Sequence, residues 1–254
     1  SNEIWIAALN GIIASWDGTT MTEIGNLSNV ISNCHNEQGL LGFEFTHDFS
    51  SSQEILLSYT ENADCEGGSN LSGMVIASVE VVDNKINMNS LVELRTIAKE
   101  NRNHNGGNLH SLNDGTYLWS LGDGGGSSDP YGNGQNVHNP LGTIQYFSYG
   151  DKMIEPVFDN YGNDTDYVLH HGLRNPWKFD TDNQGRLWIA DVGQYCFEEV
   201  NVVPMLTQSN FGWSEREGMH IYDPSDDCSS PPDALTDSSL TCLLYTSPSP
   251  RDNR

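Results

Sequence analysis

In four segments of the sequence, polar side chains stand close to glycines in a pattern that could support binding or catalysis. They are Glu37-Gln38-Gly39-Leu40-Leu41-Gly42-Phe43, Asn103-His104-Asn105-Gly106-Gly107-Asn108-Leu109, the glycine-rich run from Gly122 to Asn136, and Gly172-Leu173-Arg174-Asn175-Pro176-Trp177 with the later Asp191-Val192-Gly193-Gln194.

His104 and Arg174 are the side chains with the clearest chemical potential. His104 stands before an asparagine and two glycines, where the backbone can approach a ligand closely. A neutral imidazole there could take a proton from a hydroxyl group, and a turn histidine without a chemical role is the alternative. Arg174, held beside an Asn-Pro step, offers a planar cation for carboxylate or carbonyl oxygens. A structural ion pair is the alternative for this residue.

Acidic side chains near these segments suit other roles. The glycine-rich run is not followed by a Gly-Lys-Ser/Thr step and lacks the ligand spacing of an EF-hand, so it predicts a long ordered loop. Asp123 and Asp129 within it are expected to form turns. Glu198 and Glu199 offer hard oxygen ligands of the kind calcium prefers, and a solvated acidic pair is the alternative.

Short β-rich runs must position these segments. They recur at 54–59, 74–79, 117–121 and 186–190, and the segment 91–99 fits a helix or a strand equally well. Residues 112–119 and 181–188 share a pattern, in which a polar turn ending in Gly precedes a strand with Leu-Trp. Such recurrence favours the blades of a β-propeller, with a β-sandwich as the alternative.

The composition excludes several classes of protein. With 11 Lys and Arg against 35 Asp and Glu, the chain carries a formal net charge of −24 and would repel a nucleic-acid backbone. No apolar run reaches the roughly 18 residues that a membrane span needs. No signal peptide is visible, and because the chain opens on a strand-like segment we expect its natural N-terminus to be missing. Among five cysteines, the pairs Cys34–Cys65 and Cys196–Cys228 would suit an oxidising compartment, although spacing alone fixes no connectivity.

The C-terminal part of the sequence differs in composition. We expect residues 1–222 to form part of a propeller domain and residues 223–254 to be a low-complexity tail rich in Ser, Pro and Asp. The last stretch, from Cys242 to Asp252, is typical of translated sequencing-adapter read-through, with a disordered linker as the alternative.

Taken together and in order, the motifs resemble the soluble quinoprotein glucose/sorbosone dehydrogenase family, which includes aldose sugar dehydrogenases dependent on pyrroloquinoline quinone (PQQ). The resemblance runs from about residue 3 to residue 218. It rests on Glu-Gln-Gly-Leu-Leu-Gly, Asn-His-Asn-Gly-Gly, Gly-Asp-Gly-Gly-Gly, Gly-Leu-Arg-Asn-Pro-Trp, Asp-Val-Gly-Gln with Glu-Glu-Val-Asn, and Asn-Phe-Gly-Trp.

The resemblance implies an all-β, six-bladed β-propeller of which this chain holds about the first three to four blades. It implies that His104 is the general base in the oxidation of a sugar at its anomeric hydroxyl, and that Arg174 stabilises charge on the quinone. The cofactor contacts it implies are Glu37, Arg174, Asn175 and Gly193. The calcium ligands it implies are the backbone carbonyls of Gly193 and Gln194, where some members have Pro at the second position, and the side chain of Glu199.

The resemblance also sets expectations for the whole protein. It implies a periplasmic or secreted enzyme with a sugar substrate, PQQ and calcium as cofactors, and an electron acceptor that the sequence does not name. Family members carry further cationic cofactor contacts in later blades, so we expect this chain alone to be inactive. A non-catalytic binding propeller, as in hedgehog-interacting proteins, and a calcium-stabilised structural propeller are the alternatives. Retention of His104, Arg174, Asn175 and Gly193 favours the enzyme.

Overall fold

The computed structural model describes residues 3–62, 73–157, 167–225 and 243–248. These residues form four sheets and one short hairpin. The first sheet contains β1 (Ile4–Ala7), β2 (Ile12–Trp16) and β3 (Met21–Asn26). The second contains β4 (Leu40–Phe45), β5 (Glu54–Thr60), β6 (Met74–Val82) and β7 (Lys85–Ile97), with the single-turn helix α1 (Phe49–Ser52) between β4 and β5.

The third and fourth sheets follow in chain order. The third contains β8 (Gly106–Ser111), β9 (Thr116–Leu121), β10 (Thr143–Gly150), β11 (Met153–Pro156), β12 (Val168–His171) and β16 (Ser209–Asn210). The fourth contains β13 (Pro176–Thr181), β14 (Arg186–Asp191), β15 (Phe197–Pro204) and β19 (Leu243–Pro248). The hairpin pairs β17 (Arg216–Glu217) with β18 (His220–Ile221).

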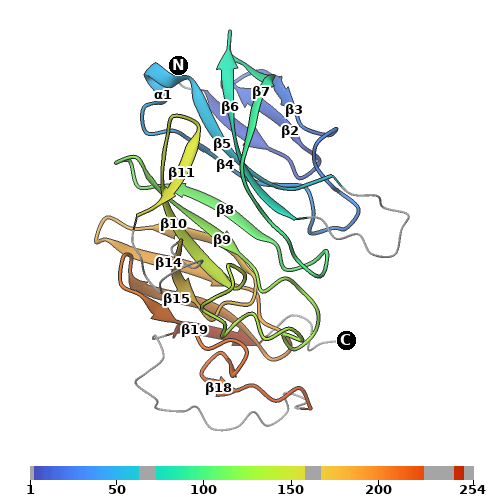
Figure 1. Cartoon of the computed structure of the whole chain (residues 1–254), viewed down its shortest axis with the longest axis vertical. Coiled ribbons are helices and arrows are strands. Elements are labelled where there is room, and N and C mark those ends of the chain that lie inside the picture. Colours follow the sequence, from blue (N-terminus) through green and yellow to red (C-terminus); the bar gives the residue numbers. More distant parts are fainter. Residues whose placement is uncertain (1–2, 63–72, 158–166, 226–242, 249–254) are drawn as a thin grey trace.

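The four sheets are arranged as successive blades of a propeller. The first strand of each sheet contacts the first strand of the next, so that β1, β4, β8 and β13 form the inner row. In Figure 1 the sheets follow one another from the blue strands of the first to the orange and red strands of the fourth. The expectation of an all-β propeller with three to four blades present is confirmed among the described residues, and the segment 91–99 is a strand to Ile97 rather than a helix.

Alternation along the strands builds a separate core between each pair of neighbouring blades. On β9, Tyr117 and Trp119 belong to the core shared with the second sheet, whereas Leu118 belongs to the core shared with the fourth. This is the period of two that a strand buried on both faces requires. Both Leu-Trp segments of the sequence lie on the second strand of a blade, β9 and β14, which confirms that they are equivalent repeats.

Tight turns fix the register of the hairpins. Asp83 and Asn84, between β6 and β7, have φ values of 51° and 58°, and Asp151 and Lys152, between β10 and β11, have 51° and 58°. Two consecutive residues with positive φ twist the chain in the sense that matches the twist of the flanking strands. The strands therefore pair closely at these turns.

The structure bears on the predictions about the C-terminal segment and the cysteines. β19 lies inside the segment 223–254 that the composition separates from the propeller, and it pairs antiparallel with β15. The boundary at residue 222 and the origin of the final residues stay predictions. Cys34 and Cys196 are disulfide-bonded, while their predicted partners Cys65 and Cys228 lie outside the described residues. Among the residues described, none belongs to a helix of sufficient length and apolar character to cross a membrane.

Candidate active site

The predicted site residues gather at one edge of the blades because of how antiparallel strands alternate. Glu37, His104 and Arg174 each precede the inner strand of a blade, namely β4, β8 and β13. Asp123 and Asp191 lie at the end of the second strand of a blade, after β9 and on β14. The start of one strand and the end of its antiparallel neighbour meet at the same edge of a sheet. The topology therefore brings these five side chains from three successive blades to one place.

His104 is held between an acid and a guanidinium. Its Nδ1 lies 2.7 Å from Asp123 Oδ1 and its Nε2 lies 2.9 Å from Arg174 Nη2. Since a guanidinium only donates, Nε2 must accept, and the proton of the neutral ring is on Nδ1, where it is donated to Asp123. The imidazole is 4% exposed. His104 thus presents an unprotonated Nε2, the atom a general base needs.

Asp123 has a larger role than the sequence predicted. It forms a turn as expected, since Oδ1 accepts the backbone N–H of Gly125 at 2.9 Å. However, Oδ1 also accepts a hydrogen bond from His104 Nδ1, and Oδ2 accepts one from the indole N–H of Trp213 at 2.8 Å. The carboxylate is 1% exposed. The prediction that Asp123 is only a turn residue was incomplete, and its place beside a strand end in a run of glycines was the available signal. Asp129 does act as a turn residue, bonding the N–H groups of Asn133 and Gly134.

The guanidinium of Arg174 is fixed along its edges. Nε and Nη2 donate to Gln194 Oε1 at 3.1 and 3.0 Å, and Nη1 donates to the backbone oxygen of Val192 at 2.8 Å. The Arg174 side chain also lies over the ring of Trp213, 5.6 Å from the ring to the guanidinium carbon. Gln194, predicted to act through its backbone carbonyl, therefore also positions Arg174 through its side chain.

Asn175 and Glu37 lock the loops to one another. The backbone N–H groups of Arg174 and Asn175 donate to the two oxygens of Asp191, at 2.9 and 2.6 Å. Asn175 Oδ1 accepts the N–H of Gly106 at 3.1 Å, just after the His104 loop. Glu37 Oε2 accepts the N–H of His104 itself at 2.8 Å. The structure therefore brings Glu37, His104, Arg174 and Asn175 together.

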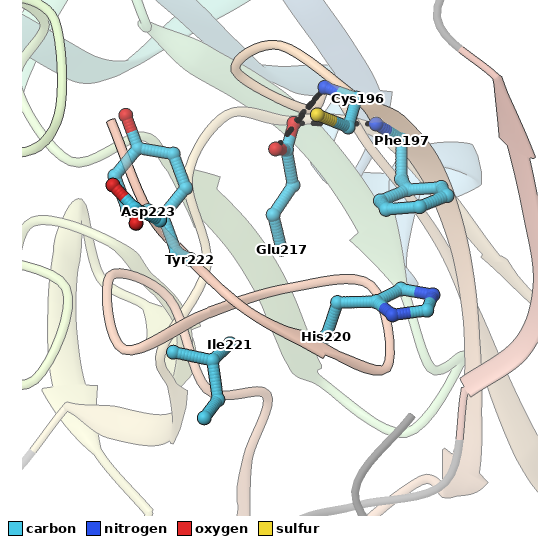
Figure 2. A pocket seen from close by; sticks show the side chains of 7 residues that line it. All are labelled: Cys196, Phe197, Glu217, His220, Ile221, Tyr222 and Asp223. Atoms are coloured by element: carbon cyan, nitrogen blue, oxygen red, sulfur yellow. Dashed lines mark hydrogen bonds between the residues drawn. The ribbon is translucent and has the colours of Figure 1, made fainter. Parts of the chain in front are cut away.

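Gly193 and Gln194 begin a loop that wraps a single carboxylate. Glu217 Oε1 accepts the consecutive backbone N–H groups of Gln194, Tyr195 and Cys196 at 2.6, 2.7 and 3.1 Å. Figure 2 shows this carboxylate directed at Cys196 and the backbone of Phe197, in the small pocket where His220 stacks on Phe197. Converging N–H groups of this kind form a nest for negative charge.

A glycine is required at the start of this loop. A Cβ atom on Gly193 would lie 1.5 Å from the backbone oxygen of Phe197, so any other residue would force the loop apart. The N–H of Gly193 donates to Glu198 Oε2 at 3.0 Å. Glu198 is therefore tied to this loop rather than solvated as half of a free acidic pair.

Behind this loop, acidic side chains are buried close to one another. Burial raises the pKa of Glu199, and the charges of Asp191 and Glu217 raise it further. Burial likewise raises the pKa of Asp191. The neighbouring amide oxygen, Asn201 Oδ1, is buried and without a hydrogen-bond partner, although Asn201 Nδ2 donates to Glu199 at 3.2 Å. Within the described ranges no cluster of three His, Cys, Asp or Glu side chains has the arrangement of a metal site.

The propeller blades agree with comparisons to known proteins. The family model for glucose/sorbosone dehydrogenase matches residues 2–239, so the chain belongs to this family. Among solved structures it is similar to the PQQ-bound aldose sugar dehydrogenase of Streptomyces coelicolor, with a TM-score of 0.71, 22% identity, and coverage of 97% of this chain and 65% of that one. It is also similar to the soluble aldose sugar dehydrogenase of Escherichia coli, with a TM-score of 0.67, 20% identity, and coverage of 85% and 60%.

The curated relatives match this chain over only a small part of their own length. The HIPL1 protein of Arabidopsis thaliana is 31% identical over 140 residues, which is 48% of this chain and 20% of that protein. This chain therefore spans about a fifth of the length of that relative and 65% of the Streptomyces enzyme. The structural similarities confirm the propeller fold.

Proposed function

We propose that the protein of which this chain is part oxidises an aldose at its anomeric hydroxyl to the lactone, with PQQ as hydride acceptor and calcium as Lewis acid. Membership of the glucose/sorbosone dehydrogenase family supports this proposal. The observation that carries it is the buried pair of His104 with Asp123, which leaves an unprotonated Nε2 beside the Arg174 guanidinium.

The chain's own residues perform the proton transfer. His104 Nε2 takes the proton of the anomeric hydroxyl, and the Asp123 carboxylate stabilises the imidazolium that forms. The chemistry that PQQ would supply when bound is an electrophilic carbonyl able to accept a hydride. Arg174, already oriented by Gln194 and Val192, would stabilise negative charge developing on an oxygen of the cofactor. Glu37 and Asn175 hold the two loops that carry these groups.

The residues present fit a quinone cofactor and calcium. For the quinone, a buried guanidinium and an imidazole converge just before the starts of the inner strands β8 and β13. For calcium, burial and the neighbouring charges of Asp191 and Glu217 raise the pKa of Glu199, and Asn201 has an oxygen without a partner. Excess buried negative charge with a spare oxygen suits a hard cation. We assign Glu199 and the backbone carbonyls of Gly193 and Gln194 as ligands, and the periplasm or cell exterior as the location.

The test uses the full-length protein that contains this chain, prepared free of metal. Dye reduction with a panel of aldoses is measured with PQQ and calcium added separately and together. We expect activity only with both, at least 100-fold reduced in His104→Ala and unchanged in His138→Ala, an exposed histidine of the glycine-rich loop region. If the full-length protein binds no PQQ by absorbance titration, the dehydrogenase proposal fails and a binding propeller replaces it.

A further inference from the structure

Lys99 is a buried cation that the sequence analysis did not single out. It follows the end of β7 by two residues and is 4% exposed. Its Nζ donates to the backbone oxygen of Asn103 at 2.8 Å and to Asn105 Oδ1. Lysine is almost never fully buried unless its ammonium group is partnered. The cost of burying this charge points to a specific task for it.

The two acceptors of Lys99 flank the predicted base. Asn103 and Asn105 are the sequence neighbours of His104, so the ammonium holds the loop on both sides of that residue. Asn105 connects this network to Glu37, because its Nδ2 donates to the backbone oxygen of Glu37 at 2.8 Å. Glu37 in turn accepts the N–H of His104 through its side chain. Lys99 thereby completes a ring of hydrogen bonds around the His104 backbone.

The backbone of His104 needs such support. Its φ is 52°, in the left-handed region that a residue with a Cβ seldom adopts. Non-glycine residues keep this conformation only where the surroundings enforce it. The conformation is what directs the ring to Asp123 on one side and Arg174 on the other.

The charges around Lys99 come from three segments. Glu37 before β4, Glu100 beside Lys99 and Asp123 after β9 all favour its charged form, whereas burial disfavours it and lowers the pKa of Lys99 to about 7. The three carboxylates therefore favour the ammonium form of Lys99 against the effect of burial.

We propose that Lys99 is a positioning residue, which fixes His104 with its imidazole between Asp123 and Arg174. Its meaning for catalysis rests on the proposed function, but the geometric claim does not. The ammonium makes no direct contact with the His104 ring among its hydrogen bonds, so it acts through Asn103 and Asn105.

The test observes the His104–Asp123 hydrogen bond directly in this chain. Proton NMR of the wild type is expected to show a downfield Nδ1–H signal, assigned by its loss in His104→Asn. Lys99→Met removes both hydrogen bonds at similar side-chain length, and we expect the signal to vanish or to exchange at least tenfold faster with solvent. Lys85→Met, at the exposed start of β7, is the matched control and should leave the signal unchanged.

Folding is checked for each variant by circular dichroism. If Lys99→Met does not fold, Lys99→Gln, which keeps an amide donor, takes its place and should give intermediate exchange. An unchanged signal in a folded variant overturns the proposal, and so does failure of both variants to fold, since Lys99 would then serve the fold as a whole. In the full-length enzyme we expect kcat to fall 10- to 100-fold with PQQ affinity unchanged. A wild type without dehydrogenase activity would refute the proposed function and leave the NMR result standing.

Discussion

Asp123 joins two side chains that have different tasks. One oxygen accepts a hydrogen bond from His104 Nδ1. The other accepts one from the indole N–H of Trp213, whose ring lies under Arg174. A single carboxylate therefore sets both the tautomer of His104 and the position of the aromatic ring beneath the Arg174 guanidinium. Replacing Asp123 by Asn would remove the charge beside His104 and keep the volume of the side chain.

We expect Asp123→Asn to lower kcat of the full-length enzyme by roughly 10²–10⁴-fold, because the amide cannot stabilise an imidazolium. The KM for sugar should change little, since Asp123 is directed at His104 rather than at open space. Steady-state kinetics measures both. Asp151→Asn, in an exposed turn where Asn tolerates the positive φ, is the control. Equal kcat in Asp123→Asn and the wild type would contradict the assignment of His104 as base.

Some of these residues could be predicted from the sequence and others could not. His104, Arg174 and Asn175 stand in motifs framed by glycine or proline, which constrain the backbone locally and can be recognised without a structure. The roles of Lys99 and of the Gln194 side chain depend on partners that only the assembled blades bring near. Gln194, for example, reaches Arg174 across 20 positions.

Among the elements, the third blade departs most from a simple four-stranded meander. Its third strand, β10, pairs with both β11 and β12, and β12 pairs in parallel with the short β16. The sequence predicted the turns at 113–115 and 182–185 because they contain Asn, Asp and Gly. It did not predict the pairing of β12 with β16, since two residues of strand leave no period to recognise.

The buried His170 of β12 makes this element sensitive to acid. Burial lowers the pKa of His170 from 6.5 to about 4, and its Nε2 is bonded to the backbone oxygen of Met205. Between these two pH values the unfolded chain binds a proton that the folded chain does not, so stability is complete above pH 6.5 and is lost as pH falls toward 4.

We expect the free energy of unfolding in urea to fall by about 2 kcal/mol more in the wild type than in His170→Gln when pH is lowered from 7 to 5. The test compares how the free energy of unfolding changes with pH in each protein. A loss of packing in the variant lowers its stability equally at both pH values, so it cancels. His138→Gln, with an exposed ring, should behave as the wild type does. Parallel pH profiles for wild type and His170→Gln would show that this histidine titrates normally in the folded protein.

At the scale of the whole molecule, the first sheet exposes an apolar row. Ile4, Trp16 and Met21 lie opposite one another across β1, β2 and β3, and their exposed fractions are 54%, 38% and 56%. Ile6, two positions along β1, extends the row on the same face and is 44% exposed. Contiguous exposed apolar surface of this kind promotes association with other surfaces.

We therefore expect this chain to self-associate with increasing concentration, and Ile4→Lys to shift it toward the monomer. Analytical ultracentrifugation of both chains measures the change. Val82→Lys places the same charge at another exposed apolar residue, at the end of β6, and should have little effect. A wild-type chain that stays monomeric, or equal effects of the two lysines, would show that the row on the first sheet is not the contact.

The hydrogen bonds that join the loops of three blades also impose an order on folding. Each blade can close through local hairpins, but His104 is bonded to Glu37 across 67 positions and to Arg174 across 70. Contacts between distant positions form slowly, because the chain must lose loop entropy before they form. The group of hydrogen bonds around His104 is consequently a late product of folding, complete only in chains whose second, third and fourth blades have already docked.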